Sequence, residues 1–530
     1  MTATNAQRGR AFWEHPALLA ALVLAASVPL LLPAIPPLTD LPGHMARYHV
    51  ELAIDRSPHL GRYFGFDWAL IGNLGVDLLI VPIAKLFGVE LGTKLIVLAI
   101  PMLTVAGFLA VAREVHGRIP PTAFFALPLA YSFPVQFGFV NFALASGLCF
   151  LAFALWLRLG RTGRLRLRAL LFVPLASLVW LCHIYGWGVL GVLAFSAETA
   201  RHREKGDSWL HAAWRGALAC LPLALPFVLM IVWRSGSVEG DTGDWFNWGN
   251  KAMWLVSLLR EHWQAWDFAA AMLLILLCLM GLLGIDFRIA LPLRLAFVLL
   301  FLLFLLIPRV LIGSGYADMR MAPVMIAVGL LGLDLKPGAR QRLAALVAVA
   351  GLAFVAARLT VTTVVFAKLD RVWQHQLAAV PHIAPGSRVL VMADGPCTGA
   401  WANRRVDHVD GLAVVRRDVF TNGMWALPGA QLLQVRYTKG DPFVTDPSHL
   451  LRPPVCRGRM PGLDDALAAL PGNFDYLWLI DLPRDQWPRA PGLVPVWHGE
   501  TGTLYRAAAG APAVNRAADE TRRSESPARR

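Results

Sequence analysis

Long apolar runs separated by short polar segments fill the first two thirds of the 530-residue chain. A run of about 18 or more apolar residues is long enough to cross a bilayer as a helix. The pattern predicts an α-helical polytopic membrane protein with about eleven transmembrane helices over residues 16–365. We place the spans at 16–37, 91–112, 122–137, 142–158, 168–182, 185–200, 213–233, 266–285, 290–307, 321–336 and 342–362.

One apolar segment, 74–88, is short and contains Asp77, Pro82 and Lys85. If it crossed the membrane, the loop "REVHGR" (113–118) would lie on the opposite side from the other basic loops. An amphipathic helix lying in the membrane interface keeps every basic loop on one side. We therefore expect an interfacial helix here, within a long first outer loop at 38–90.

The basic residues lie in short loops between the apolar runs: "RLGRTGRLRLR" (158–168), "RHREK" (201–205) and "KPGARQR" (336–342). This is the positive-inside pattern, which predicts that these loops and residues 1–15 are cytoplasmic. The net charge of +14 therefore reflects membrane orientation and does not indicate nucleic-acid binding. An odd number of spans places the C-terminal part outside, in the periplasm of a bacterial inner membrane.

The chain changes character after about residue 365. The segments "SRVLVMAD" (387–394) and "FDYLWLIDL" (474–482) are apolar runs of strand length, "GETGTLYRA" (499–507) is a third candidate strand, and "LDDALAALPG" (463–472) has helical spacing. We expect a small α/β extracytoplasmic domain at 366–510 and a disordered tail at 511–530. Cys397 and Cys456 lie in this domain, either as a disulfide or as two free thiols.

The first chemical candidate is "PPLTDLPGHMARYHVE" (36–51), directly after the first span. In a helix over 39–51, Asp40, His44, Arg47 and Glu51 lie near one face, and we take His44 and Arg47 as substrate-binding candidates. A carboxylate at a membrane boundary is partly desolvated, which raises its pKa towards the range of a general base. Asp40 with His44 can also hold a divalent ion. The alternative is that Asp40 or Thr39 only caps the helix.

The second candidate is "RVLIGSGYADMRMAP" (309–323), an outer loop before a late span. A guanidinium at Arg320 suits a phosphate through bidentate hydrogen bonds, and Tyr316 belongs to the same substrate-binding candidates. The alternative is that Arg320 pairs with Asp318 or extends towards the headgroups.

Other outer polar residues include Asp67 and His183, which we also take as substrate-binding candidates, although a lone histidine is more often structural. Ionisable residues are nearly absent from the middle of the predicted spans, where transporters of polar cargo usually carry them. The polar groups gather at one face instead. That arrangement suits chemistry between a lipid-borne substrate and the outer aqueous space.

The order of a first span, an acidic residue at its outer end, a long outer loop with an interfacial helix, many spans and an outer α/β domain resembles the GT-C class of integral membrane glycosyltransferases. That class includes protein O-mannosyltransferases and aminoarabinose transferases of lipid A. The resemblance covers residues 15–365, including "LLIVPIAKLFGVELGTKLIVLAI" (78–100). It implies a sugar donor carried on polyprenyl phosphate, Asp40 as catalytic base or metal ligand, and Arg320 holding the lipid phosphate.

One departure from the family is that Leu41, not a second acid, follows Asp40. A second acid would have to come from Asp67 or Glu51. The cofactor therefore stays unknown, with a divalent metal ion as the candidate and Asp40 and His44 as its candidate ligands.

The expected function is transfer of a sugar to a glycan, lipid or protein acceptor of the cell envelope, with inversion if displacement is in line. The alternatives are a flippase or exporter of a glycolipid or polysaccharide precursor, and a non-catalytic envelope scaffold. The expected partners are the lipid donor, the acceptor and the bilayer, and no nucleic acid.

Overall fold

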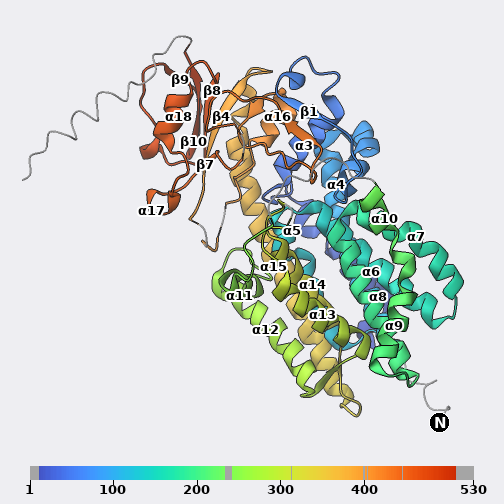
Figure 1. Ribbon diagram of the computed structural model, residues 1–530. Helices are drawn as coiled ribbons and strands as arrows, with labels where there is room; N and C mark the ends of the chain where they lie inside the picture. The colour runs from blue at the N-terminus through green and yellow to red at the C-terminus, as the bar shows by residue number, and fades with distance from the viewer. Residues whose placement is uncertain are drawn as a thin grey trace, which may run out of the picture.

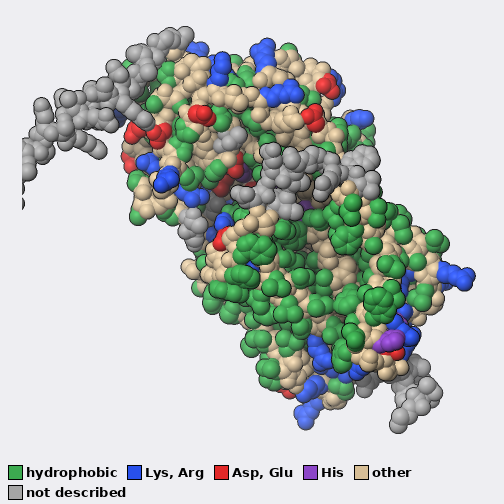
Figure 2. Space-filling view, in the orientation of Figure 1, with side chains coloured by type: hydrophobic (Ala, Val, Ile, Leu, Met, Phe, Trp, Pro, Cys, Tyr) green, Lys and Arg blue, Asp and Glu red, His purple; other side chains and the backbone are tan. Residues whose placement is uncertain are grey.

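The computed structural model describes residues 11–232, 242–311, 313–397, 400–402, 404–444 and 446–508. A long helical body carries a mixed α/β domain at one end, and the helix α15 (Gln341–Leu377) runs from the body into that domain (Figure 1). Apolar side chains gather over the body, and Lys and Arg side chains group at its lower end (Figure 2). The predicted tail at 511–530 lies outside the described residues.

Five of the described helices are long and apolar enough to cross a membrane, or up to six if each bent pair counts as one span. This agrees with a multi-pass membrane protein, whereas the predicted number of eleven spans is not confirmed. The five are α4 (Gly75–His116), α6 (Val140–Arg161), α7 (Leu165–Cys182), α12 (Gln264–Leu283) and α15, and the bent pair joins Trp209–Ala219 to Leu221–Ile231.

Prolines explain two places where the expected single spans are broken. The run at 16–37 forms α1 (Pro16–Ala25) and the short α2 (Val28–Leu31), which has Pro29 near its start. The run at 122–137 forms a buried 3-10 helix, η3 (Pro121–Tyr131), and α5 (Phe133–Phe137). Proline lacks the N–H that an α-helix needs and clashes with the preceding turn, so these segments cannot continue as regular spans.

The remaining helices of the body and its loops are shorter or less apolar than these five. They are η1 (Phe12–Glu14), α3 (Leu41–Ala53), η2 (Leu60–Arg62), α8 (Ile184–Glu204), α9 (Trp209–Ala219), η4 (Leu221–Leu223), α10 (Leu225–Val232), α11 (Trp248–Val256), α13 (Leu291–Leu306) and α14 (Ala317–Leu331). The strands β2 (Phe287–Ile289) and β3 (Leu333–Leu335) pair with each other in antiparallel orientation.

The helix α4 is broken at Gly88, whose φ of 73° lies in the left-handed region. Glycine tolerates this conformation because it has no Cβ. The break separates the segment 75–87 from the apolar helix that follows. It lies where the sequence predicts the end of an interfacial helix and the beginning of a span.

Several basic loops meet at one end of the body. Arg118, Arg161, Arg201, Arg288 and Arg294 line one cavity of about 760 Å³ there. They come from five different segments, so the predicted grouping of the basic loops on one side agrees with the packing.

The C-terminal domain is built on a sheet in the order β5-β4-β8-β10-β9, with β7 also pairing with β4. The pairs of β4 are parallel and those of β10 are antiparallel. The strands predicted at 387–394, 474–482 and 499–507 are confirmed as β4, β8 and β10. The bounds are β4 (Arg388–Asp394), β5 (Phe420–Thr421), β7 (Leu450–Leu451), β8 (Tyr476–Ile480), β9 (Leu493–His498), β10 (Gly502–Ala507), η5 (Val380–His382), α16 (Gly411–Arg417), α17 (Pro454–Arg457), α18 (Leu463–Ala469) and η6 (Arg484–Gln486).

The first outer loop is joined to this domain. Its strand β1 (Phe64–Phe66) pairs antiparallel with β6 (Leu433–Val435) of the domain. Its helix α3 packs on α16 so closely that a Cβ at Gly411 would lie 2.5 Å from the carbonyl oxygen of Pro42. The two segments are more than 350 residues apart in sequence, and they form one unit in the fold.

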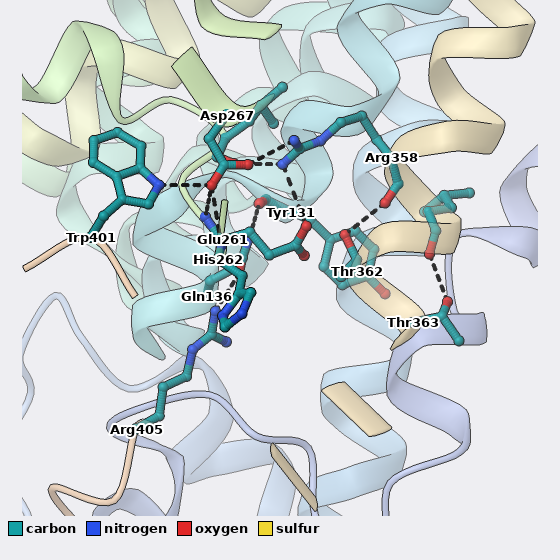
Figure 3. Close-up of polar contacts among 12 residues, drawn as sticks. Tyr131, Gln136, Glu261, His262, Asp267, Arg358, Thr362, Thr363, Trp401 and Arg405 are labelled. Atoms are coloured by element: carbon teal, nitrogen blue, oxygen red, sulfur yellow. Dashed lines mark hydrogen bonds and ion pairs between the residues drawn. The ribbon is translucent and has the colours of Figure 1, made fainter. Parts of the chain in front are cut away.

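A buried charge network fastens the helices to the domain (Figure 3). Asp267 of α12 pairs with Arg358 of α15 at 2.8 Å and accepts a hydrogen bond of 2.8 Å from the indole N–H of Trp401 in the domain. The backbone N–H groups of Glu261 and His262 also donate to Asp267, at 2.7 and 3.1 Å. These hydrogen bonds and the ion pair offset the cost of desolvating the buried carboxylate. The network can therefore hold the three segments together.

We expect Asp267→Ala to destabilise the protein by about 3–5 kcal/mol, because it removes the carboxylate 2.8 Å from the buried guanidinium of Arg358 and leaves the more distant Glu261, at 3.6 Å, as its one carboxylate partner among the described residues. Thermal unfolding of the detergent-solubilised protein measures the loss. The matched control is Glu114→Gln, which breaks the pair with Arg161, a side chain that is 63% exposed, and should cost at most ~1 kcal/mol. Equal melting temperatures for the two variants would contradict the structural role of the network.

Candidate active site

A cavity of about 920 Å³ lies where the helical body meets the C-terminal domain. Its lining comes from the start of α3, the loop before α6, the loops before α8, α12 and α14, and three segments of the domain. Among the predicted site residues, Asp40, His44, His183, Tyr316 and Arg320 line this cavity. The predicted meeting of Asp40 with Arg320 is therefore present in the fold.

Asp40 stands at the beginning of α3, and its side chain makes no capping hydrogen bond. The reading of Asp40 as a simple helix cap is therefore not supported. Its backbone N–H donates to the carbonyl of Phe137 at 2.9 Å, which fixes the residue against the loop before α6. Burial raises the pKa of the Asp40 carboxyl to about 7, opposed by the nearby His408.

His408 of the domain faces Asp40, with 3.9 Å between its Nε2 and a carboxylate oxygen of Asp40. Asp446 lies 3.8 Å from the same nitrogen. Burial alone would lower the pKa of His408, but the carboxylates of Asp446 and Asp40 outweigh it and raise that pKa. The domain thus adds an imidazole and a second carboxylate to the side of the cavity that holds Asp40.

Arg320 lies on α14 and is 7% exposed. One of its N–H groups donates to the carbonyl of Gly315 at 2.9 Å, and its guanidinium lies 4.0 Å from the ring centre of Phe139. No carboxylate of a described residue lies within ion-pair distance of it. Asp318, which the sequence offered as its partner, instead pairs with Lys251 at 3.5 Å and accepts a hydrogen bond from Trp254. A buried guanidinium without a paired carboxylate is suited to an anionic ligand.

Aromatic side chains line the cavity near Arg320. Tyr316 contacts Phe137 and Phe139, with ring centres 5.4 and 6.4 Å apart. Trp254 stands edge-on to Tyr316 at 6.0 Å. His183 accepts a hydrogen bond from the backbone N–H of Tyr185 at 3.1 Å and so also caps α8. This wall offers flat apolar faces beside a cation.

Two predicted substrate-binding residues do not line the cavity. Arg47 is buried further along α3, where it pairs with Asp77 at 3.0 Å and fastens α3 to α4. Asp67 is exposed in the first loop and accepts a hydrogen bond from Gln434 at 2.5 Å. Helical spacing brings His44 towards Trp425 and the cavity, but it does not show which neighbours a helix will meet.

The sequence reading missed the residues that the C-terminal domain contributes, including Asp407, His408 and Asp446, which line the cavity. The only signal was local: "VDHVD" (406–410) and "DPSH" (446–449) place acids and histidines close together in loops. Among the described residues, one group of three has ligand atoms within 4.8 Å of one another, namely His408, Asp446 and His449. It contains neither Asp40 nor His44, the two ligand candidates from sequence.

No family model and no curated protein matches the sequence. Among solved structures, the chain is similar to ArnT from Cupriavidus metallidurans bound to undecaprenyl phosphate, with a TM-score of 0.50 and 13% identity over 95% of this chain and 100% of that chain. The apo crystal structure of the same protein matches with a TM-score of 0.49 and 12% identity over 92% and 97% of the two chains.

The chain has a GT-C fold. The class of fold inferred from the sequence is thereby confirmed. At this level of identity the likeness concerns the fold alone, so the chemistry has to be argued from the cavity.

Gly138 is the residue that places Asp40. Its φ is 107°, and a Cβ there would lie 2.7 Å from the backbone nitrogen of Asp40. We expect Gly138→Ala to cost about 1–2 kcal/mol for the backbone conformation and a further ~1–3 kcal/mol for the clash, as measured by thermal unfolding.

The matched control is Gly163→Ala. Gly163 also has a positive φ, 69°, but a Cβ there meets nothing within 4 Å. The control should show only the backbone cost. If Gly138→Ala were no less stable than the control, the close fit around Asp40 would be wrong.

Proposed function

We propose that the protein is a membrane glycosyltransferase that moves a sugar from a polyprenyl-phosphate donor to an acceptor of the cell envelope. The observation that carries the proposal is a single cavity lined by a largely buried carboxylate, Asp40, whose side chain is 13% exposed, and by the buried guanidinium of Arg320, which has no carboxylate partner among the described residues. The GT-C fold supports it, since the similar ArnT structure holds undecaprenyl phosphate.

Arg320 is the proposed site for the lipid phosphate. Leaving-group departure places negative charge on that phosphate, and a preorganised guanidinium stabilises the charge as it develops. The neighbouring Phe139 and Tyr316 give the sugar or the first part of the lipid an apolar surface.

Asp40 is the proposed general base. The acceptor hydroxyl must lose its proton as it attacks the anomeric carbon, and a carboxylate on the side of the cavity away from the phosphate can accept that proton. The bond from the anomeric carbon to the phosphate oxygen breaks as the new bond to the acceptor oxygen forms. If attack and departure are in line, the anomeric configuration inverts.

The proposed sidedness puts the cavity on the periplasmic face of a bacterial inner membrane. A disulfide joins Cys397, at the cavity, to Cys456. Disulfides persist in oxidising compartments, which supports a periplasmic domain. The arginine-lined cavity lies at the end of the body where the basic loops meet, as expected for the cytoplasmic side.

The exporter alternative has less support. An exporter needs a route through the membrane, whereas the two largest of the cavities described above share no lining residue.

We expect Asp40→Asn to reduce transfer from a polyprenyl-phosphate sugar by about 10²–10⁴-fold in kcat, because the amide cannot accept the proton. A panel of lipid-linked sugars with purified protein in nanodiscs measures it. The matched control is Glu51→Gln on the same helix, since Glu51 does not line the cavity and should keep near-normal transfer. Full activity in a folded Asp40→Asn protein would exclude the assigned base.

We expect Arg320→Ala to raise the apparent KM for the donor by about 10–100-fold, as expected for loss of hydrogen bonds to a charged group. Arg320→Lys should recover part of the loss, because it restores the charge without the planar fork. Donor titration at saturating acceptor measures the change, with Arg288→Ala at the opposite end of the body as the control. An unchanged donor KM in Arg320→Ala would remove its phosphate role.

A further inference from the structure

The side of the cavity built by the C-terminal domain contains a group of side chains that the transfer reaction above does not use. His408 and Asp446 line the cavity, and His449 lies behind them with no exposed surface. The side chain of Asp446 is 30% exposed, so the group is open to the cavity at that point.

The polar atoms of this group face one another at distances too long for hydrogen bonds. Asp446 Oδ1 lies 3.8 Å from His408 Nε2 and 3.5 Å from His449 Nδ1. Hydrogen bonds between such groups are about 2.7–3.2 Å long. By contrast, two ligands bound to one tetrahedral ion at ~2.1 Å lie roughly 3.4 Å apart. The spacing therefore suits three ligands around an ion better than a closed hydrogen-bond network.

The tautomer of His408 is set from the other side of its ring. Its Nδ1 lies 3.2 Å from the carbonyl oxygen of Gly423, to which a protonated Nδ1 donates. The lone pair of the neutral imidazole is then on Nε2, which faces Asp446. Metal-binding histidines are commonly oriented by this kind of hydrogen bond to a backbone carbonyl.

His449 provides an independent observation. It is fully buried, and apart from a contact with the backbone of Asp407 its ring nitrogens have no hydrogen-bond partner among the described residues. Leaving a buried imidazole unsatisfied costs free energy. Its backbone is fixed to the sheet, since its carbonyl accepts a hydrogen bond of 2.8 Å from the N–H of Ala393. The ring is held in place by the fold and lacks a partner that an ion would supply.

The surrounding charge favours a cation. Asp40, Asp407, Asp410 and Asp446 all interact electrostatically with His408. Arg320, one of several arginines that line the cavity, interacts with Asp40. A dication at the domain side would balance these carboxylates.

We propose that His408, Asp446 and His449 bind one divalent transition-metal ion at the domain side of the cavity, with zinc as the best fit and an open coordination position facing Asp40. Two imidazoles and one carboxylate are typical ligands of catalytic zinc, whereas Mg²⁺ and Ca²⁺ prefer oxygen ligands only. The ion would bind and polarise the acceptor hydroxyl beside Asp40. This last role rests on the proposed transferase function, but the metal site does not.

The test is metal binding by the full-length protein, purified without a polyhistidine tag, stripped with chelator and dialysed against Zn²⁺, Co²⁺ or Mg²⁺. Elemental analysis should find one equivalent of Zn²⁺ and no retained Mg²⁺. The Co²⁺ form should show the visible absorption of a cobalt ion with nitrogen and oxygen ligands. A wild-type protein that retains no Zn²⁺ and gives no such Co²⁺ spectrum would overturn the proposal.

Asp446→Asn and His449→Gln should each weaken Zn²⁺ binding at least ~10-fold in a competition with a chromogenic chelator. Loss of a residue that only orients a metal ligand already costs about 10–100-fold in affinity, and these variants change the proposed ligands themselves. His498→Ala, an exposed histidine on β9 of the same domain, should retain the wild-type stoichiometry and affinity. Unchanged affinity in both ligand variants would also overturn the site. Because the wild-type measurements stand alone, a variant that does not fold leaves the proposal testable.

Metal binding and transfer activity are separate readouts. A protein that binds zinc but transfers no lipid-linked sugar would leave the metal site standing and remove the proposed reaction. A protein that transfers sugar without binding zinc would support the proposed reaction and overturn the metal site.

Discussion

The arrangement depends on one arginine of the C-terminal domain, Arg405. It is buried, and its guanidinium donates to the carbonyl of Pro37 at 2.9 Å and to the side chain of Gln136 at 2.5 Å. Pro37 belongs to the chain segment before Asp40, and Gln136 belongs to α5, whose last residue accepts the backbone hydrogen bond of Asp40. Arg405 itself has a φ of 57°, a conformation that non-glycine residues adopt only when the surroundings hold them there. The docking of the domain and the placement of Asp40 are therefore one constraint.

The charged residues near this junction fall into two groups. In the first, each charge is buried with a matched partner and holds elements together: Asp267 with Arg358, and Arg47 with Asp77. In the second, Arg320 and His449 are buried and the Asp40 side chain is 13% exposed, and among the described residues none of the three has an oppositely charged partner closer than 3.5 Å. Burying an unpaired polar group costs free energy, and the proposed lipid phosphate and metal ion would supply the missing partners at this site. The presence or absence of a matched partner therefore separates the site residues from residues in structural ion pairs, which the sequence alone does not distinguish.

Much of the fold could be predicted from local patterns. The apolar runs, the basic loops and the strands of the C-terminal domain follow from hydropathy and periodicity, and the helix after Asp40 follows from its spacing. Hydropathy predicts continuous spans at 16–37 and 122–137, but the prolines in these runs break the helices. Helical spacing predicts Arg47 at the site because it shows which residues share a face, but it does not show which element packs against that face. In the structure Arg47 pairs with Asp77 of α4.

The residues that the sequence could not supply are those brought in by tertiary contacts. His408 and Asp446 lie some 370 and 400 residues beyond Asp40 in a domain whose docking has no local signal. The two proposed substrates reach the cavity from different sides, which explains why contacts between the body and the domain are needed. In the proposed reaction the donor has a long lipid tail and approaches from the bilayer, so its phosphate meets Arg320 on a helix of the body. The acceptor hydroxyl of the proposed reaction meets Asp40 of the first loop and His408 of the domain, which face each other. A site that joins the two must lie at the junction between body and domain, where neither part is complete alone.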